Sequence, residues 1–290
     1  MPHTPNAAAR IPAAPKSIQK GTPLKHLLGR EAVDCLLHNI ALSYADFDQD
    51  GFRSAALEGL EPLGILERGQ KIGAALRQHL PQKYATAAEI LLASLTPPLT
   101  RTDSIGLEVF FYLPHVCFVR EYGVKPEENE GEDPFEISMQ AQYELTQRFS
   151  AEFSIRSFLI SNQERTMTRL SEWTSDGSPH VRRLCSEGTR PRLPWSQKIP
   201  AFVRNPAHTL PILEALKHDP DLYVRRSVAN HLGDVAKDHP DFVFSVCERW
   251  LAGASNEIRW LIRHALRHPA KKGNATALRL RAAAKPLPGG

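Results

Sequence analysis

Three acidic residues lie in helical apolar patterns where acids are otherwise scarce, and they are the first candidates for chemistry. Glu152 borders an apolar stripe, Glu187 precedes Gly188, and Asp234 follows Gly233. Carboxylates in such positions can be catalytic, but each also has a basic residue at the spacing of a helical ion pair. The possible pairs are Glu152 with Arg156, Glu187 with Arg183, and Asp234 with Lys237. Spacing alone leaves the catalytic and the structural interpretation open.

The histidines and cysteines offer no compact metal site. Four cysteines lie tens of residues apart with no C-x-x-C, and no H-E-x-x-H occurs. His264 and His268 are four residues apart in an Arg-rich helical segment, where solvated side chains are the simpler interpretation. The glycine-rich phosphate loops and the G-x-S-x-G motif are also absent. The sequence therefore predicts no metal and no cofactor.

Charge is distributed unevenly along the 290 residues. Residues 1–155 carry 14 basic and 20 acidic side chains, a net charge of −6, whereas residues 156–290 carry 22 and 12, a net charge of +10. Many of the basic residues in the second half are arginine pairs at matching places. Such a pattern is typical of a basic stripe that binds a polyanion, and DNA or RNA is the expected partner.

An internal repeat in the basic half predicts how these groups are positioned. Each of three copies has an apolar helix, a cluster of helix-breaking residues and a second helix that begins with Val or Ile followed by Arg. The aligned segments run from Trp173 to Val181-Arg182-Arg183, from Leu216 to Val224-Arg225-Arg226, and from Trp250 to Ile258-Arg259-Trp260. Copies 43 and 34 residues apart are typical of HEAT-like repeats, which stack into an α-solenoid with one concave face.

The arginines that open successive second helices would make this concave face basic. Helix N-termini also attract phosphate, so the two effects would add. The alternative is a ladder of surface salt bridges between neighbouring repeats that binds no ligand. The charge excess of this half favours the nucleic-acid interpretation.

The remaining chain also has helical apolar spacing and almost no strand signals, so the predicted fold class is all-α, with no C-terminal β-domain. The expected organisation is a disordered basic tail (1–22), a single HEAT-like-repeat domain (23–281) made of a helical block (23–124), a polar loop (125–133) and a repeat region (134–281), and a frayed tail (282–290). No stretch approaches the roughly 18 apolar residues of a spanning helix. Neither a spanning helix nor a secretory signal is predicted, so we expect a cytoplasmic protein.

Several segments resemble one known family. They are FFYLPH (110–115), AEFSIR (151–156), VRRLCSEGTRPRLPW (181–195) and VRRSVANHL (224–232). From about Leu24 to Leu280 the chain resembles the AlkC-type branch of the HEAT-like-repeat DNA alkylation-repair glycosylases. The string SEGTRPRLPW is specific enough to make the resemblance strong.

The resemblance implies a monofunctional DNA glycosylase of base excision repair. Its expected substrates are the cationic N3-methylated bases 3-methyladenine and 3-methylcytosine in duplex DNA, and it would need no obligate protein partner and act as a monomer. By motif, the catalytic residues would be Glu152, Glu187 and Asp234, with Glu152 and Asp234 favoured for direct catalysis. The DNA-binding residues would be Arg156, Arg182, Arg183, Arg190, Arg192, Trp195, Arg225, Arg226 and Lys237.

Two departures from the family pattern and one alternative accompany this prediction. Gly233 stands where the family motif predicts Asn, and no strand-rich sequence follows Leu280, although some members carry a β-sandwich there. The alternative function is a non-catalytic scaffold that binds DNA or protein. Since a purely phosphate-binding face gains nothing from carboxylates, the enzyme interpretation predicts that the three acids converge in one concave cavity.

Overall fold

The computed structural model describes residues 7–103 and 105–287, which contain helices and no strand. This confirms the all-α fold class. The chain divides into two compact units, Met1–Phe158 (unit 1) and Leu159–Gly290 (unit 2). The boundary therefore lies after residue 158, whereas the sequence predicts one domain with a dividing loop at 125–133. Within the described residues, no helix is long and apolar enough to cross a membrane.

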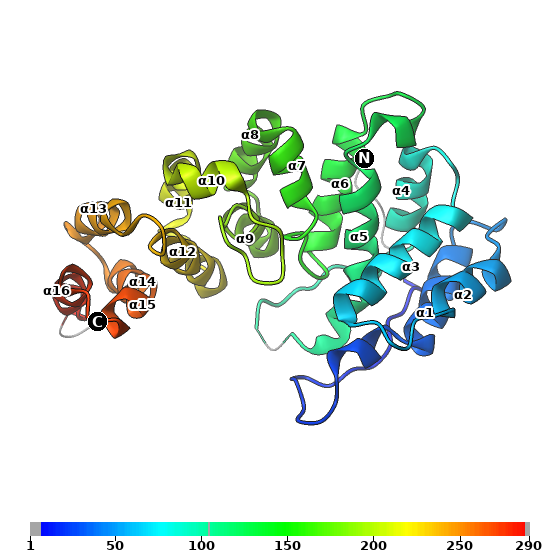
Figure 1. Ribbon diagram of the computed structural model, residues 1–290, viewed down its shortest axis with the longest axis horizontal. Coiled ribbons are helices and arrows are strands. Elements are labelled where there is room, and N and C mark those ends of the chain that lie inside the picture. Colours follow the sequence, from blue (N-terminus) through cyan, green and yellow to red (C-terminus); the bar gives the residue numbers. More distant parts are fainter. Residues whose placement is uncertain (1–6, 104, 288–290) are drawn as a thin grey trace. The chain divides into compact units, whose positions relative to one another are not determined.

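Unit 1 is a helical block in which α3 packs against α5 and α4 against α6 (Figure 1). Its elements are η1 (Leu24–Leu28), α1 (Arg30–Ala41), α2 (Gln49–Leu57), α3 (Ile65–His79), α4 (Tyr84–Ala93), η2 (Leu107–Tyr112), α5 (Leu113–Tyr122), η3 (Pro126–Asn129) and α6 (Phe135–Thr146). Glycine permits the close approach of α3 and α5, because a Cβ at Gly69 would lie 2.7 Å from Cγ of Leu113. Helix α7 (Ile155–Ser161) spans the boundary between the units.

The polar segment 125–133 is docked on unit 1. Arg77 on α3 lies 2.8 Å from the carboxylate of Glu128, and the side chain of Asn129 is buried and accepts a hydrogen bond of 2.9 Å from the Ala85 amide. Charge complementarity and one buried amide therefore hold a segment whose composition predicts a solvated loop.

Both predicted tails also make ordered contacts. The backbone N–H and C=O of Arg10 bond the Asn39 side chain at 2.9 and 2.8 Å, and the Leu107 amide donates to the Pro15 carbonyl at 3.0 Å. At the other end, the Leu287 amide donates to Asn256 at 2.8 Å. The described parts of 1–22 and 282–290 thus differ from the disordered and frayed tails expected from composition.

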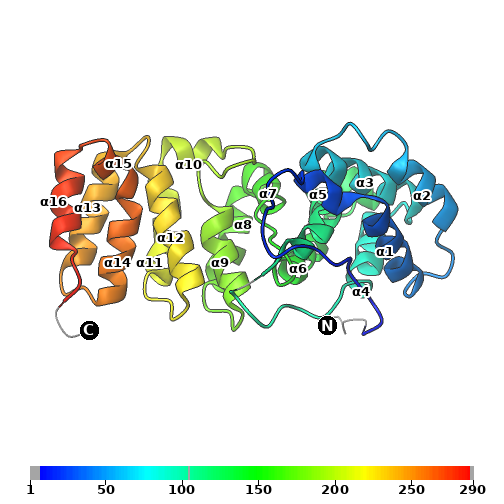
Figure 2. The ribbon, with the colours of Figure 1, turned by 90° about the horizontal axis from the view of Figure 1, so that it is seen from below.

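Unit 2 is a stack of helix pairs, and each of the three aligned sequence copies coincides with one pair. Its elements are α8 (Gln163–Trp173), α9 (Pro179–Gly188), α10 (Pro200–Arg204), η4 (Pro206–Thr209), α11 (Leu210–Leu216), α12 (Leu222–Val235), α13 (Pro240–Leu251), α14 (Asn256–Ala265), α15 (Arg267–Lys271) and α16 (Ala275–Ala283). The pairs are α8 with α9, α11 with α12, and α13 with α14. The second helices lie side by side, with α12 between α9 and α14 (Figure 2).

Helix α12 occupies this central place because of its residue pattern. Val224, Val228 and Leu232 recur every four residues and are fully buried, so they form one apolar face. Ser227, His231 and Asp234 form an adjacent polar stripe that faces α9. The central helix of the stack is thus held by apolar packing on one face and by polar contacts on another.

Candidate active site

Two of the three predicted carboxylates meet at the contact between α9 and α12. Glu187 ends α9, Asp234 lies in the last turn of α12, and Arg190 bridges them. Nη1 of Arg190 lies 2.5 Å from Oε1 of Glu187, and its Nε lies 2.7 Å from Oδ2 of Asp234. All three residues are at most 8% exposed. The site therefore contains two buried carboxylates that share one buried guanidinium.

The polar stripe of α12 completes this contact. The Ser227 hydroxyl donates to Oε2 of Glu187 at 2.6 Å. Nδ1 of His231 lies 3.0 Å from the Ser186 carbonyl, and because a carbonyl only accepts, His231 donates from Nδ1. Burial lowers the pKa of His231 to about 4, so the ring is neutral at pH 7. These bonds fix the relative position of the two helices.

Electrostatics keep Glu187 ionised despite its burial. Desolvation raises its pKa, but the neighbouring Arg183 and Arg190 and the Ser227 hydroxyl outweigh this effect, and the net pKa lies below the ordinary value. Arg183 is 3.5 Å from Glu187 and also lies over the ring of Tyr223, 4.9 Å from its centroid. Both oxygens of Glu187 thus have partners within the protein.

Asp234 differs from Glu187 because it lines an open pocket. Lys237 contacts its second oxygen, Oδ1, at 2.8 Å. The pocket has a volume of about 470 Å³ and is lined by Arg190, Asn230, Gly233, Asp234, Lys237, Ala265, Arg267, His268 and Lys271. A carboxylate held between Arg190 and Lys237 at the edge of such a space can stabilise positive charge that develops on a bound substrate.

Glu152 belongs to unit 1. It lies in the turn between α6 and α7, where the Ser150 hydroxyl donates to its Oε2 at 2.7 Å. The structure brings Glu187 and Asp234 together within unit 2, and the convergence of Glu152 with them stays a prediction. Among the described residues, no group of three His, Cys, Asp or Glu side chains could hold a metal ion.

Comparison with known proteins identifies the family. No protein-family model matches the chain. Its structure is similar to that of the Pseudomonas fluorescens alkylpurine DNA glycosylase AlkC bound to DNA containing an abasic site analog, with a TM-score of 0.78 and 36% identity, covering 90% of this chain and 68% of that one. The chain belongs to the AlkC family of DNA glycosylases. It is also 37% identical over 258 residues to the uncharacterized protein YhaZ of Bacillus subtilis (strain 168), covering 89% of this chain and 67% of YhaZ.

Two of the arginines predicted to bind DNA have structural partners in this AlkC-family chain. Arg182 makes a two-point ion pair with the buried Asp219 of the next helix pair, at 2.6 and 3.1 Å. Arg225 donates to the carbonyls of Asp219 and Pro220 at 2.6 and 2.9 Å. The Arg182 contact joins neighbouring repeats, as a ladder would, whereas the Arg225 contacts lie within one repeat, between α12 and the loop that precedes it.

The other predicted DNA-binding residues differ in their accessibility. Arg156 is fully buried, unlike a side chain at a nucleic-acid surface. Arg192 pairs with Asp238 at 2.5 and 2.9 Å. Arg226 is exposed, and Trp195 is 62% exposed with a left-handed backbone at φ 62°. This backbone conformation is costly for a bulky residue.

The AlkC-family resemblance did not identify every residue of the pocket wall. Asn230, Arg267, His268 and Lys271 line the pocket but were absent from the predicted set. Asn230 lies one turn before Asp234 on the same face of α12, and this spacing could have revealed it. Arg267 and Lys271 lie about 35 residues further along the chain, so only the tertiary fold brings them here.

Gly233 has a packing role in this AlkC-family site. A Cβ at this position would lie 3.3 Å from the Ala265 carbonyl oxygen of α14. The glycine therefore permits α12 and α14 to approach closely at the floor of the pocket, where the family motif predicts Asn.

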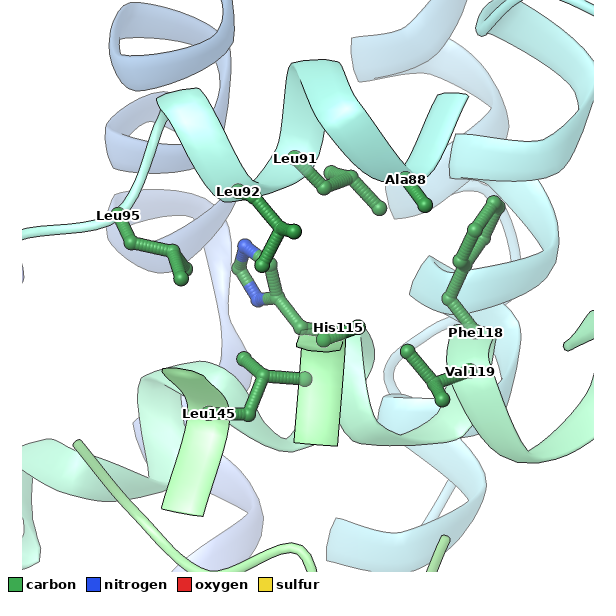
Figure 3. Close-up of a pocket in the computed structure, with 9 residues that line it drawn as sticks. Ala88, Leu91, Leu92, Leu95, His115, Phe118, Val119 and Leu145 are labelled. Atoms are coloured by element: carbon green, nitrogen blue, oxygen red, sulfur yellow. The ribbon is translucent and has the colours of Figure 1, made fainter. Parts of the chain in front are cut away.

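A second cavity, in unit 1, is no base-binding site. It has a volume of about 10 Å³, and its lining includes Leu92, Phe118, Leu145 and the buried His115 (Figure 3). Such a space fits about one water molecule. Burial lowers the pKa of His115 to about 3, so the ring is neutral. The last residue of the FFYLPH segment is thus part of the hydrophobic core.

Proposed function

We propose that this chain is a monofunctional glycosylase of base excision repair that hydrolyses the N-glycosidic bond of N3-methylated bases, 3-methyladenine and 3-methylcytosine, in duplex DNA. The observation that carries the proposal is the Asp234 carboxylate, held between Arg190 and Lys237 at the edge of an open pocket. The similar AlkC structure supports the purine part of the proposal, 3-methyladenine, because that protein is an alkylpurine DNA glycosylase bound to DNA containing an abasic site analog.

Hydrolysis of this glycosidic bond needs a carboxylate but no general acid. A base methylated at N3 already carries positive charge, so it leaves without being protonated. The reaction then depends on stabilising an oxocarbenium-like sugar and on guiding a water to it, and an ionised carboxylate close to the sugar does both. Arg190 and Lys237 fix the orientation of Asp234 before substrate binds.

The three acids are assigned different roles in this proposal. Asp234 acts directly on the sugar or the water. Glu187 is a positioning residue, since it is not among the residues that line the pocket and it orients Arg190. Glu152 is the second candidate for direct catalysis, and its role depends on the predicted convergence.

Duplex DNA is the proposed partner. The accessible members of the predicted set, Arg226, Lys237 and Trp195, would contact it, while Arg182 and Arg225 support the scaffold. We propose that the protein binds as a monomer and repairs DNA in the cytoplasm, without a metal or cofactor.

The test is release of methylated base from duplex DNA at saturating enzyme, comparing the wild type with Asp234→Asn. Removing one preorganised electrostatic contact typically costs about 10²–10³-fold in rate, and this loss is the expected result. Asp241→Asn is the matched control, because Asp241 is an exposed acid on α13 outside the pocket. A wild type that binds DNA but releases neither base would contradict the proposal and favour the scaffold.

A further inference from the structure

The part of the pocket wall that α15 supplies carries a group of cations. Arg267 and Lys271 lie on α15, are exposed, and line the same pocket as Asp234 and Lys237. His268 of α15 also lines it. The pocket wall thus combines the Asp234 carboxylate of α12 with basic side chains of α15.

Arg267 is held in place by uncharged partners. Its Nη2 donates to Oδ1 of Asn230 at 3.0 Å, and its Nη1 donates to the His264 carbonyl at 2.7 Å. Nε2 of His264 lies 3.1 Å from the same Asn230 oxygen, and its ring stacks on Trp260 at 5.0 Å between centroids. These bonds use two of the five N–H groups of the guanidinium, so the others remain for a ligand.

Arg267 and Lys271 form no ion pair with an acid among the described residues. No carboxylate lies within 4.0 Å of the side-chain nitrogens of Arg267 or Lys271 in residues 7–103 and 105–287. His264 adds no positive charge, because burial, followed by the charges of Arg267 and Arg226, lowers its pKa to about 4. Arg190, in contrast, is fully engaged by Glu187 and Asp234. An anion is therefore the ligand that this wall favours.

The spacing along α12 relates the cations to the proposed chemistry. Asn230, which holds Arg267, and Asp234 are four residues apart, or about 6 Å along the helix axis. In a nucleotide, the backbone phosphate and the C1′ atom are separated by one sugar. A carboxylate directed at C1′ and a guanidinium bonded to Asn230, the residue one helical turn before that carboxylate, can thus serve the same nucleotide.

We propose that Arg267 and Lys271 form a subsite for one backbone phosphate of the nucleotide whose glycosidic bond is broken. The proposal rests on the proposed function, because it takes Asp234 as the group next to the sugar. Asn230 is the positioning residue of this subsite. Binding the phosphate places the sugar against Asp234 and requires no deep pocket for the base.

The first experiment measures the salt dependence of binding to a duplex that contains a tetrahydrofuran abasic-site analog. One lost phosphate contact lowers the slope of log K against log salt by about 0.9, and Arg267→Gln/Lys271→Gln is expected to show this decrease. The control Lys272→Gln/Arg279→Gln removes the same charge from exposed positions outside the pocket lining and is expected to leave the slope unchanged. Equal slopes for the two double variants would overturn the proposal.

The second experiment identifies the phosphate. Single phosphates next to the analog are replaced by neutral methylphosphonates, and the wild type is expected to lose affinity at one position. Arg267→Gln/Lys271→Gln should show no further loss there, whereas equal losses in both proteins would overturn the proposal. Neither binding experiment needs catalysis, so a wild type that passes both and yet releases no methylated base contradicts only the proposed function.

Discussion

The two sides of helix α12 use charge in opposite ways. Toward α9, Glu187, Arg190 and Asp234 form a buried cluster whose charges are matched and whose hydrogen bonds are made within the protein. Toward α14 and α15, Arg267 and Lys271 are exposed. Arg267 bonds uncharged groups of Asn230 and His264, and neither cation has an acidic partner within the described residues. Paired charges thus hold this site together, whereas Arg267 and Lys271, which have no acidic partner among the described residues, are the charges that we propose to bind DNA.

Arg190→Met is expected to be the most destabilising change on the α9 side. It leaves two buried carboxylates without their shared cation, and breaking a buried ion pair costs about 3–5 kcal/mol in the free energy of unfolding. Urea unfolding measures this loss. The control is Arg192→Met, which breaks a solvent-screened pair with Asp238 and should cost far less than the buried cluster. Similar losses for both variants would mean that the buried cluster is not a structural unit.

Arg182→Met tests whether the repeat ladder is structural. Asp219 is buried and loses its two-point partner, so we expect the free energy of unfolding to fall by about 2–3 kcal/mol. The salt slope of DNA binding should stay unchanged. A flatter slope with unchanged stability would instead assign Arg182 to the DNA-binding set.

The pH dependence of stability tests the neutral histidine of the α9 side. His231 protonates near pH 6.5 in the unfolded chain but only near pH 4 in the folded protein. Between these values the unfolded state binds more protons, so stability falls as the pH decreases, by up to about 1.4 kcal/mol per pH unit. Urea unfolding between about pH 6.5 and pH 5 should show a shallower decline for His231→Gln than for the wild type. Parallel declines would show that His231 titrates normally.

Gly233→Ala tests the close packing on the α14 side and has the smallest expected effect. Alanine favours the helix by about 1 kcal/mol, whereas its Cβ would lie 3.3 Å from the Ala265 carbonyl and push the helices apart slightly. We expect a net change in the free energy of unfolding within about 1 kcal/mol. A loss of several kcal/mol in thermal or urea unfolding would mean that the contact between α12 and α14 has no freedom to adjust.

The sequence predicted the helix pairs because each repeat carries its own apolar spacing and breaker cluster. It also singled out Glu187 and Asp234, through the motifs that surround them; the structure brings the two together, and their catalytic role stays a prediction. The partners of the arginines were harder to predict, because Arg182 contacts Asp219 and Arg267 contacts Asn230, and each pair is 37 residues apart in the sequence. The residues next to an arginine in the sequence do not predict such long-range contacts. Arg182 therefore forms a structural ion pair, whereas Arg267 lies in the pocket wall without an acidic partner among the described residues.

The docked segment 125–133 is a second case in which contacts between distant residues could not be predicted from the local sequence. Its composition is that of a solvated loop, and its own residues predict no ordered structure. Arg77 and Ala85 supply the partners of Glu128 and Asn129 from helices about 45 to 50 residues earlier in the chain. Tertiary contacts override local composition here.

The central claim is that Asp234 supports glycosidic cleavage from a preorganised position, and single-turnover release of 3-methyladenine from duplex DNA tests it most directly. We expect Asp234→Asn to lower the rate of base release by at least about 10²-fold and Asp241→Asn to leave it unchanged. Both variants are compared saturated with DNA, after circular dichroism has shown that they are folded. A rate for Asp234→Asn equal to that of the wild type would contradict a catalytic role of Asp234.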